Sequence, residues 1–326
     1  MHLRAFIFSI RYTSLALSFF LSVFTPASRA VELLPPKVTE PLIWKGQESA
    51  PLPTKPYRIG FWNIRWFPGH HPIQQTDESR QKQIAAVSDQ LRAWQPTIFF
   101  AAEIRSLESL KQLDVPHPFR ACTDIPRTAE ENPALPQQGM AILSMVDWEA
   151  IWVLDFSELP ESEDRPSRGI LAAQFKVDDQ LLTCYVVHLK SNRGGPETSM
   201  IRRQKAIEYL QWDWKRQGID PSRDAIMVLG DFNPSPTDPA FSAETTLTRL
   251  VELGFHHAGE GLPRSQRITL PKTRYPENDF DHIYLSAGLW NRIGGEDSPR
   301  MEVKPVGSDI SDHHALFFDM TRHFMP

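Results

Sequence analysis

The stretch Asp224–Asn233 reads DAIMVLGDFN, so that an acid and an amide follow a continuous apolar run. A run without alternating polar residues is typical of a strand that is buried on both faces, as in α/β proteins. Further along, Ser311-Asp312-His313 brings another carboxylate with a histidine beside it. Because α/β folds expose their functional side chains where strands pass into loops, we expect both segments to contribute to one site.

Four further apolar runs each carry one polar residue of a kind that enzymes use. They are Asn63 in IGFWNIRW, Glu103 in IFFAAEI, His188 in LLTCYVVHLK and Asp281 in FDHIYLS. A single polar residue of this sort is ordinarily a buried core residue with a satisfied hydrogen bond. Its recurrence at strand after strand is not expected of a simple core, and we interpret the set as one catalytic site.

The order of these residues resembles that of the endonuclease/exonuclease/phosphatase superfamily, which includes pancreatic-type deoxyribonucleases, secreted bacterial nucleases, neutral sphingomyelinases and inositol-polyphosphate phosphatases. The resemblance runs from about Arg58 to Met320. It departs at Ala102, where the family usually has Gln, and at Thr97, where an acidic residue often opens the strand. Neither position is expected to contact a metal directly.

The resemblance implies an α/β fold, a four-layer sandwich of two packed mixed β-sheets flanked by helices. Hydrophobic patterning predicts about ten strands and four helices, at about 79–94, 106–113, 197–217 and 238–253. GILAAQFKV and LLTCYVVHLK, separated by Asp178-Asp179-Gln180, are predicted to form a hairpin. With 326 residues, 41% of them hydrophobic, the chain suits one large catalytic domain over 57–326.

Residues 1–30 have the pattern of a secretory signal peptide. Arg4 and Arg11 precede the apolar stretch TSLALSFFLSVF, and Ser28-Arg29-Ala30 places small residues where a signal peptidase reads them. The apolar stretch is short for a membrane span, so cleavage is favoured over retention as an anchor. We predict an exported protein, periplasmic or extracellular, without a transmembrane anchor after processing and without a stable protein partner.

The charge of the chain limits how it can bind a polyanion. Removal of residues 1–30 takes away three Arg and no acidic residue, and would change the net charge from −5 to −8. Such a protein cannot hold nucleic acid by a general positive field, so any polyanion must be bound by local contacts. Residues 31–56 contain six Pro and are predicted to form an extended arm that leads into the domain.

Cys122 and Cys184 are the only cysteines, and both lie in strand-like stretches. In an exported protein two such residues can pair, and we slightly favour a disulfide over two separate buried thiols. No base motif accompanies either cysteine, which speaks against a catalytic thiol.

By resemblance, Glu103 is the principal ligand of a divalent metal, with Asn63 and Asp312 beside it. Oxygen ligands of this kind suit Mg²⁺, for which Mn²⁺ can substitute. The metal would act as a Lewis acid on a phosphate oxygen.

The remaining catalytic roles also follow from the resemblance. Asp231 and Asn233 would orient the attacking water and the phosphate. The two lie two apart on a strand-like segment and are expected to share a face, although a turn is the alternative. His313 would be oriented by Asp281, and His188 would be a second imidazole at the phosphate; which histidine gives the proton stays open.

Neighbouring residues receive separate interpretations. His282 and His314 face away from the site by strand alternation and are predicted to be structural. For substrate binding, Arg168 is a candidate phosphate contact, and Lys190 is expected to share a face with His188. The basic stretch 264–275 is either a substrate-binding loop or a solvated surface.

We therefore predict an exported Mg²⁺-dependent phosphodiesterase, a nuclease that uses metal-assisted in-line attack of water. The stretch HLKSNRGG, which resembles a segment of secreted bacterial nucleases, favours nucleic acid as the substrate. One alternative is a phospholipid or phosphoinositide phosphohydrolase of the sphingomyelinase type. Another is a non-catalytic binding module, which would be expected to lack a catalytic side chain, and none is missing. DNA versus RNA and internal versus terminal cleavage stay open.

Overall fold

The computed structural model describes residues 33–46, 57–71, 73–125, 138–162, 164–272, 276–295 and 300–320. The predicted signal peptide, the second half of the predicted arm and Arg274 lie outside these ranges. The fold lies within Leu34–Pro326.

The described strands form two mixed sheets, which confirms the predicted architecture. Sheet A has the order β1 (Lys37–Thr39), β7 (Trp148–Asp155), β8 (Ile170–Val177), β9 (Gln180–His188), β10 (Ala225–Asp231), β12 (Asp281–Ser286) and β11 (Phe255–His257). Sheet B has the order β13 (Glu302–Lys304), β14 (Ala315–Met320), β3 (Tyr57–Phe67), β4 (Ile98–Ile104), β6 (Gly139–Ser144), β5 (Phe119–Cys122) and β2 (Leu42–Lys45). Each sheet contains one parallel pair, β9 with β10 and β3 with β4.

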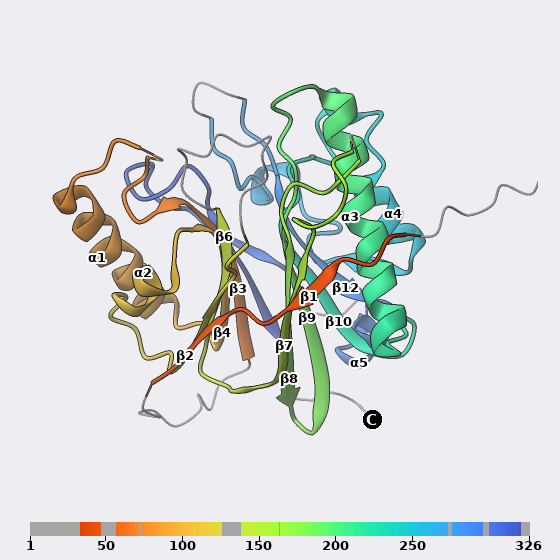
Figure 1. The fold of residues 1–326 in the computed structure, drawn as a ribbon, viewed down its shortest axis with the longest axis horizontal. Coiled ribbons are helices and arrows are strands. Elements are labelled where there is room, and N and C mark those ends of the chain that lie inside the picture. Colours follow the sequence, from red (N-terminus) through yellow and green to blue (C-terminus); the bar gives the residue numbers. More distant parts are fainter. Residues whose placement is uncertain are drawn as a thin grey trace, which may run out of the picture. The chain divides into compact units, whose positions relative to one another are not determined.

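Helices cover the outer faces of both sheets (Figure 1). Helices α1 (Asp77–Trp94) and α2 (Leu107–Lys111) lie on sheet B, and α3 (Pro196–Gln217) and α4 (Thr246–Glu252) lie on sheet A. Helix α5 (Ala287–Arg292) follows β12 directly and is too short to give a periodic signal in the sequence. No helix in the described part of the chain combines the length and apolarity needed to cross a bilayer.

The fourth predicted helix starts later than its pattern indicated. Asp238 caps a 3₁₀ turn at Pro239–Phe241, and the α-helix begins only at Thr246. Local hydrogen bonding by the capping aspartate thus interrupts an otherwise suitable apolar pattern.

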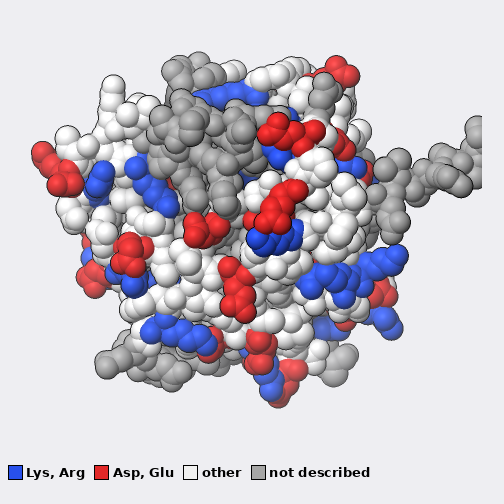
Figure 2. All heavy atoms as spheres, viewed as in Figure 1, with Lys and Arg blue, Asp and Glu red and all other residues white. Residues whose placement is uncertain are grey.

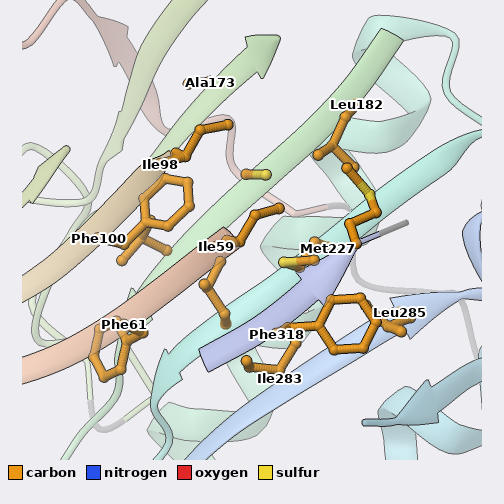
Figure 3. Packing of buried hydrophobic residues seen from close by; sticks show 14 of the residues in the cluster. Ile59, Phe61, Ile98, Phe100, Ala173, Leu182, Met227, Ile283, Leu285 and Phe318 are labelled. Atoms are coloured by element: carbon orange, nitrogen blue, oxygen red, sulfur yellow. The ribbon is translucent and has the colours of Figure 1, made fainter. Parts of the chain in front are cut away.

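The core lies between the two sheets, where side chains of alternate residues meet (Figure 3). Ile59 and Phe61 come from β3 and Met227 from β10, for example. Phe100 of β4 contacts Phe175 of β8 edge to face, with ring centroids 6.4 Å apart. Because full burial of such a side chain contributes about 1.5–3 kcal/mol, this layer holds the two sheets together and fixes where their strand ends meet.

The predicted hairpin is confirmed as β8–β9. Asp178 and Asp179 form its turn with φ of 46° and 64°, the left-handed backbone that two-residue hairpins use. Gln180, which the pattern placed in the turn, already belongs to β9.

The described part of the predicted arm forms an edge strand in each sheet. β1 pairs antiparallel with β7 of sheet A, and β2 pairs antiparallel with β5 of sheet B. Only Glu40 and Pro41 separate the two strands, so the arm passes directly from one sheet to the other (Figure 1). It therefore covers an otherwise open edge of both sheets.

The two cysteines are free, so the disulfide that we favoured is wrong. Cys184 faces the core between the sheets, whereas Cys122 belongs to the cluster on the outer face of sheet B. Burial raises the pKa of Cys122 to about 12 and raises that of Cys184 further. Two strands in different sheets, facing different layers, cannot bring these sulfur atoms together.

Candidate active site

Seven of the predicted residues lie together where strands of the two sheets end. They are Asn63, Glu103, His188, Asp231, Asn233, Asp281 and His313. Residues 63, 103, 188 and 231 stand at or near the carboxyl ends of β3, β4, β9 and β10. Asp231 is paired in register with His188 on one side and with Asp281 on the other. The two parallel pairs, one in each sheet, thus bring these ends to a common site.

Glu103 sits on an irregular part of β4. Its φ is 63°, and the register with β6 shifts between Ala102 and Ile104. One carboxylate oxygen accepts a hydrogen bond from the Trp66 backbone N–H at 3.0 Å and the other from Asn63 Nδ2 at 3.3 Å. A left-handed backbone at a residue other than glycine is unfavourable, and at a functional site it can serve to direct a side chain.

Asn63 connects the acidic residues of the two sheets. Besides Glu103, its Nδ2 donates to Asp231 Oδ2 at 3.0 Å. His188 Nε2 lies 3.6 Å from the same Asp231 oxygen and 4.0 Å from Glu103 Oε1. Asn63, Asp231 and His188 are all buried, so this group is held apart from bulk water.

Asn233 lies in a turn, and the prediction that it shares a strand face with Asp231 is wrong. β10 ends at Asp231, and Asn233 has a φ of 68°. Its backbone N–H donates to Asp231 Oδ1 at 3.0 Å, and its Nδ2 donates to the Leu189 carbonyl at 3.0 Å. The turn itself, and not strand alternation, keeps the two side chains adjacent.

His313 and Asp281 form the predicted pair. His313 Nδ1 lies 2.7 Å from Asp281 Oδ2, and since an ionised carboxylate only accepts, Nδ1 carries the proton of this bond. The contact leaves the other ring nitrogen of His313 available to a substrate. Asp281 is fully buried, and its second oxygen has no hydrogen-bond partner among the described residues.

Two hydroxyl side chains that we did not assign to the site fix this pair. Thr269 Oγ1 accepts from the backbone N–H groups of Phe280 and Asp281, each at 3.1 Å, and its carbonyl accepts from the His314 N–H. Ser311 Oγ donates to the Asn63 carbonyl at 2.7 Å and accepts from the His313 N–H. Ser311 stands in the motif next to Asp312, but Thr269 lies in a loop and carries no sequence signal.

The two imidazoles of the site differ in charge. Burial would lower the pKa of His313, but Asp281, Asp231 and Asp312 outweigh it and raise the pKa to about 10. Burial, with Arg168 and His313 nearby, lowers the pKa of His188 well below its usual value. Burial and Asp281 raise the pKa of Asp231 to about 7. At neutral pH the site thus has one protonated and one neutral histidine.

The donor set fits a hard divalent cation. Asp231 and Asp281 offer carboxylate oxygens that lie within 4.8 Å of each other, and Glu103 adds a third carboxylate, 4.0 Å from His188 Nε2. Such crowding of buried carboxylates is the environment that a bound cation stabilises. Asp312, a predicted ligand, is 35% exposed and lies 3.6 Å from Arg65 Nε instead of within this cluster.

The predicted substrate contacts have different surroundings. Arg168 donates to the Leu189 carbonyl at 2.9 Å and to Gln138 at 2.7 Å, directly beside His188. Lys190 does not share a face with His188, because β9 ends at His188 and the Lys190 amine donates to carbonyls of its own loop, including that of Ser191 at 3.0 Å.

Part of the basic stretch 264–275 is engaged in ion pairs. Arg264 pairs with Glu277 at 3.1 Å, and Arg267 lies 3.8 Å from the buried Asp279. These contacts give both arginines structural partners, and the role of the stretch in substrate binding stays a prediction.

His282 and His314 both face away from the catalytic residues, as predicted. His282 Nε2 contacts the Pro234 carbonyl, and His314 Nδ1 accepts from the Val306 N–H at 3.0 Å.

Three solved structures illustrate the similarity of the fold. A family protein from Leptotrichia buccalis has a TM-score of 0.57 and 13% identity, covering 81% of this chain and 99% of its own. The human Nocturnin catalytic domain has a TM-score of 0.55 and 16% identity, and the match covers 88% of this chain and 96% of that domain. TDP2 from D. rerio, complexed with a single-strand DNA product, has a TM-score of 0.53 and 15% identity, and the match covers 82% of this chain and 98% of that one. At these identities the likeness concerns the fold alone.

No protein of curated function is similar enough in sequence to count as a match. The sequence model of the Endonuclease/Exonuclease/phosphatase family, by contrast, matches residues 60–313, a span that includes every catalytic residue discussed above. The chain therefore belongs to the Endonuclease/Exonuclease/phosphatase family and is a hydrolase of phosphate ester bonds.

Proposed function

We propose that this protein is an exported Mg²⁺-dependent phosphodiesterase that cleaves nucleic acid. The observation that carries the choice of substrate is the ordered loop HLKSNRGG, which begins at His188. Buried Arg203 of α3 donates to the Lys190 carbonyl at 2.7 Å and to Asn192 Oδ1 at 3.0 Å. The loop thereby holds exposed Asn192 and Arg193 four and five residues after the catalytic His188.

Binding through this loop agrees with the distribution of charge. On the face shown in Figure 2, the described Lys and Arg side chains are scattered among Asp and Glu side chains. A polyanion would therefore be held by a few contacts, for which Arg168, beside His188, and Arg193 of the same loop are candidates. The complex of the similar TDP2 structure with a single-strand DNA product supports the same substrate class.

The residues divide the chemistry among them. Asn63, Glu103 and the acidic groups beside them would hold the divalent cation, which supplies charge neutralisation for the phosphate. Asp231 and Asn233 orient water for in-line attack. His313, protonated and held by Asp281, donates a hydrogen bond to a phosphate or leaving oxygen, whereas neutral His188 can accept one.

The substrate class can be tested on the purified protein without residues 1–30. In one Mg²⁺ buffer, it is given plasmid DNA, single-stranded DNA, RNA and mixed phospholipid vesicles, and release of nucleotide or lipid head group is measured. We expect hydrolysis of at least one nucleic acid. Hydrolysis of vesicle lipid with all three nucleic acids untouched would contradict the nuclease assignment and favour the sphingomyelinase-type alternative.

A matched pair of variants checks the role of the loop in that assay. Arg193→Ala removes an exposed charge from the loop that follows His188 and should raise the KM for nucleic acid, with little change in kcat. Arg223→Ala removes a side chain that is 78% exposed and pairs with Asp220, and it should leave both constants unchanged.

Export is tested separately by cell fractionation and N-terminal sequencing. If the first thirty residues are a cleaved signal peptide, the protein should be found in the periplasm or the medium, and its sequence should begin at Val31. A cytoplasmic protein that retains residues 1–30 would contradict this part of the proposal.

A further inference from the structure

Two histidines outside the catalytic group contact each other behind the turn that carries Asn233. His282 Nε2 lies 3.1 Å from the Pro234 carbonyl oxygen, and His257 Nε2 lies 3.1 Å from His282 Nδ1. His282 is fully buried, and His257 is 9% exposed. The contacts form a chain from β11 through β12 to the residue directly after Asn233.

The chain admits one arrangement of protons. A carbonyl oxygen only accepts, so the Nε2 of His282 must carry a proton. Both rings are buried, and burial disfavours the doubly protonated imidazolium, so each ring has a single N–H. The Nδ1 of His282 is then an acceptor, and His257 must donate from its Nε2. His257 thereby fixes the tautomer that His282 needs to hold the Pro234 carbonyl.

Packing keeps the chain in place. The ring of Phe232, which lies between Asp231 and Asn233, meets the His282 ring with centroids 5.6 Å apart. The ring of Tyr284 lies 5.0 Å from that of His257 and 5.6 Å from that of Phe232, centroid to centroid. Because these rings fill the space behind the turn, His282 cannot move without moving Phe232.

Successive side chains of β12 point to opposite faces of the strand and contact two different parts of the site. Asp281 points to His313, and the next residue, His282, points to Pro234. Asn233 has a left-handed backbone, which an asparagine tolerates but which needs support from its surroundings. The hydrogen bond from His282 to the carbonyl of Pro234, the residue after Asn233, supplies that support.

We propose that His282, with its tautomer fixed by His257, is a positioning residue that holds the Asp231–Asn233 turn in its catalytic conformation. The inference deepens the proposed phosphodiesterase function and rests on it. His282 does not touch the substrate, and its effect on the rate passes through Asn233 and Asp231.

The test compares His282→Leu, His282→Gln and His117→Leu. His117 is the matched control, because it is equally buried and its Nε2 contacts the carbonyl of Pro96 at 2.9 Å, remote from the site. We expect His282→Leu to lower kcat about 10-fold to 100-fold, since small displacements of catalytic groups have effects of this size. His282→Gln, which keeps a donor for Pro234, should recover most of the rate.

Two further measurements separate positioning from loss of stability. His117→Leu should lower the thermal midpoint as His282→Leu does, yet leave kcat per folded molecule unchanged. In the Asn233→Ala background, His282→Leu should cause little additional loss of kcat, because the two residues act through one turn. A His282→Leu enzyme with unchanged kcat, or with a loss that simply multiplies that of Asn233→Ala, would overturn the proposal.

The tautomers of His257 and His282 can be measured without an assay of catalytic activity. In a long-range ¹⁵N–¹H spectrum of histidine-labelled wild-type protein, the signals missing from His282→Leu and from His257→Phe identify the two rings. We expect Nε2–H for both, and a proton on Nδ1 of His282 would overturn the proposal even if the enzyme is active. If no phosphodiester is hydrolysed, the proposed function fails, and this spectrum still decides whether His257 fixes the tautomer of His282.

Discussion

Replacement of His313 or of Asp281 by Ala is expected to lower kcat/KM for phosphodiester hydrolysis by about 100-fold or more. The physical reason is that the two side chains act as one unit. Burial lowers the pKa of His313, and without Asp281 the largest contribution that raises this pKa is gone, so the ring holds the proton that it donates less strongly. The double variant should therefore lose little beyond the worse single variant, as measured by steady-state kinetics on the same substrate.

The neighbouring histidine provides the control for this prediction. His314 is partly buried and accepts a hydrogen bond from the Val306 N–H, but it faces away from Asp281. His314→Ala should lower the thermal midpoint to some extent and leave the rate per folded molecule intact. If His313→Ala behaves in the same way, with lower stability and full activity, then the pair with Asp281 is structural and the assignment of its catalytic role is wrong.

The parts of the site that the sequence predicted are those that local pattern determines. Asp231 and His188 end apolar runs, and the end of a buried strand can be read without knowing its neighbours. The hairpin at Asp178-Asp179 likewise depends on its own turn residues. The order of the catalytic residues then indicated the family and, with it, which strands must converge.

The errors concern residues whose positions depend on distant parts of the chain. Cys122 and Cys184 seemed able to pair because both lie on strands, but they belong to different sheets and face different layers. Lys190 follows His188 with the right spacing for a shared face, yet β9 has already ended there. In each case the pattern gave the element correctly and not its boundary or its partner.

Backbone irregularity is the other feature that local pattern could not supply. Glu103 and Asn233 both have a left-handed backbone, and each is held by hydrogen bonds from elsewhere in the chain: from Trp66 to Glu103, and from Asn233 to Leu189. Thr269 fixes the site from a loop without any motif of its own. Such contacts exist only once the two sheets have packed, so propensity and spacing do not reveal them.

Removal of divalent metal is expected to abolish turnover, and addition of Mg²⁺ or Mn²⁺ to restore it. The carboxylates of Glu103, Asp231 and Asp281 are crowded within one buried site, and a hard cation offsets their mutual repulsion while neutralising the phosphate. Glu103→Gln keeps the size of the side chain but removes its charge, and should raise the metal concentration needed for half-maximal activity as well as lower kcat. Full activity in excess chelator would exclude the metal mechanism.

A measurement of binding alone separates Glu103 from its neighbours. Because a ligand that binds only the folded state stabilises it, Mg²⁺ should raise the thermal midpoint of the wild-type protein and raise that of Glu103→Gln much less. Glu108→Gln is the control, since Glu108 is 75% exposed and pairs with Lys111 at 2.8 Å. Asp312→Asn decides whether Asp312 is a ligand. If it ligates, its variant should lose the Mg²⁺ shift as Glu103→Gln does, and if it serves only Arg65, the shift should be that of the wild-type protein.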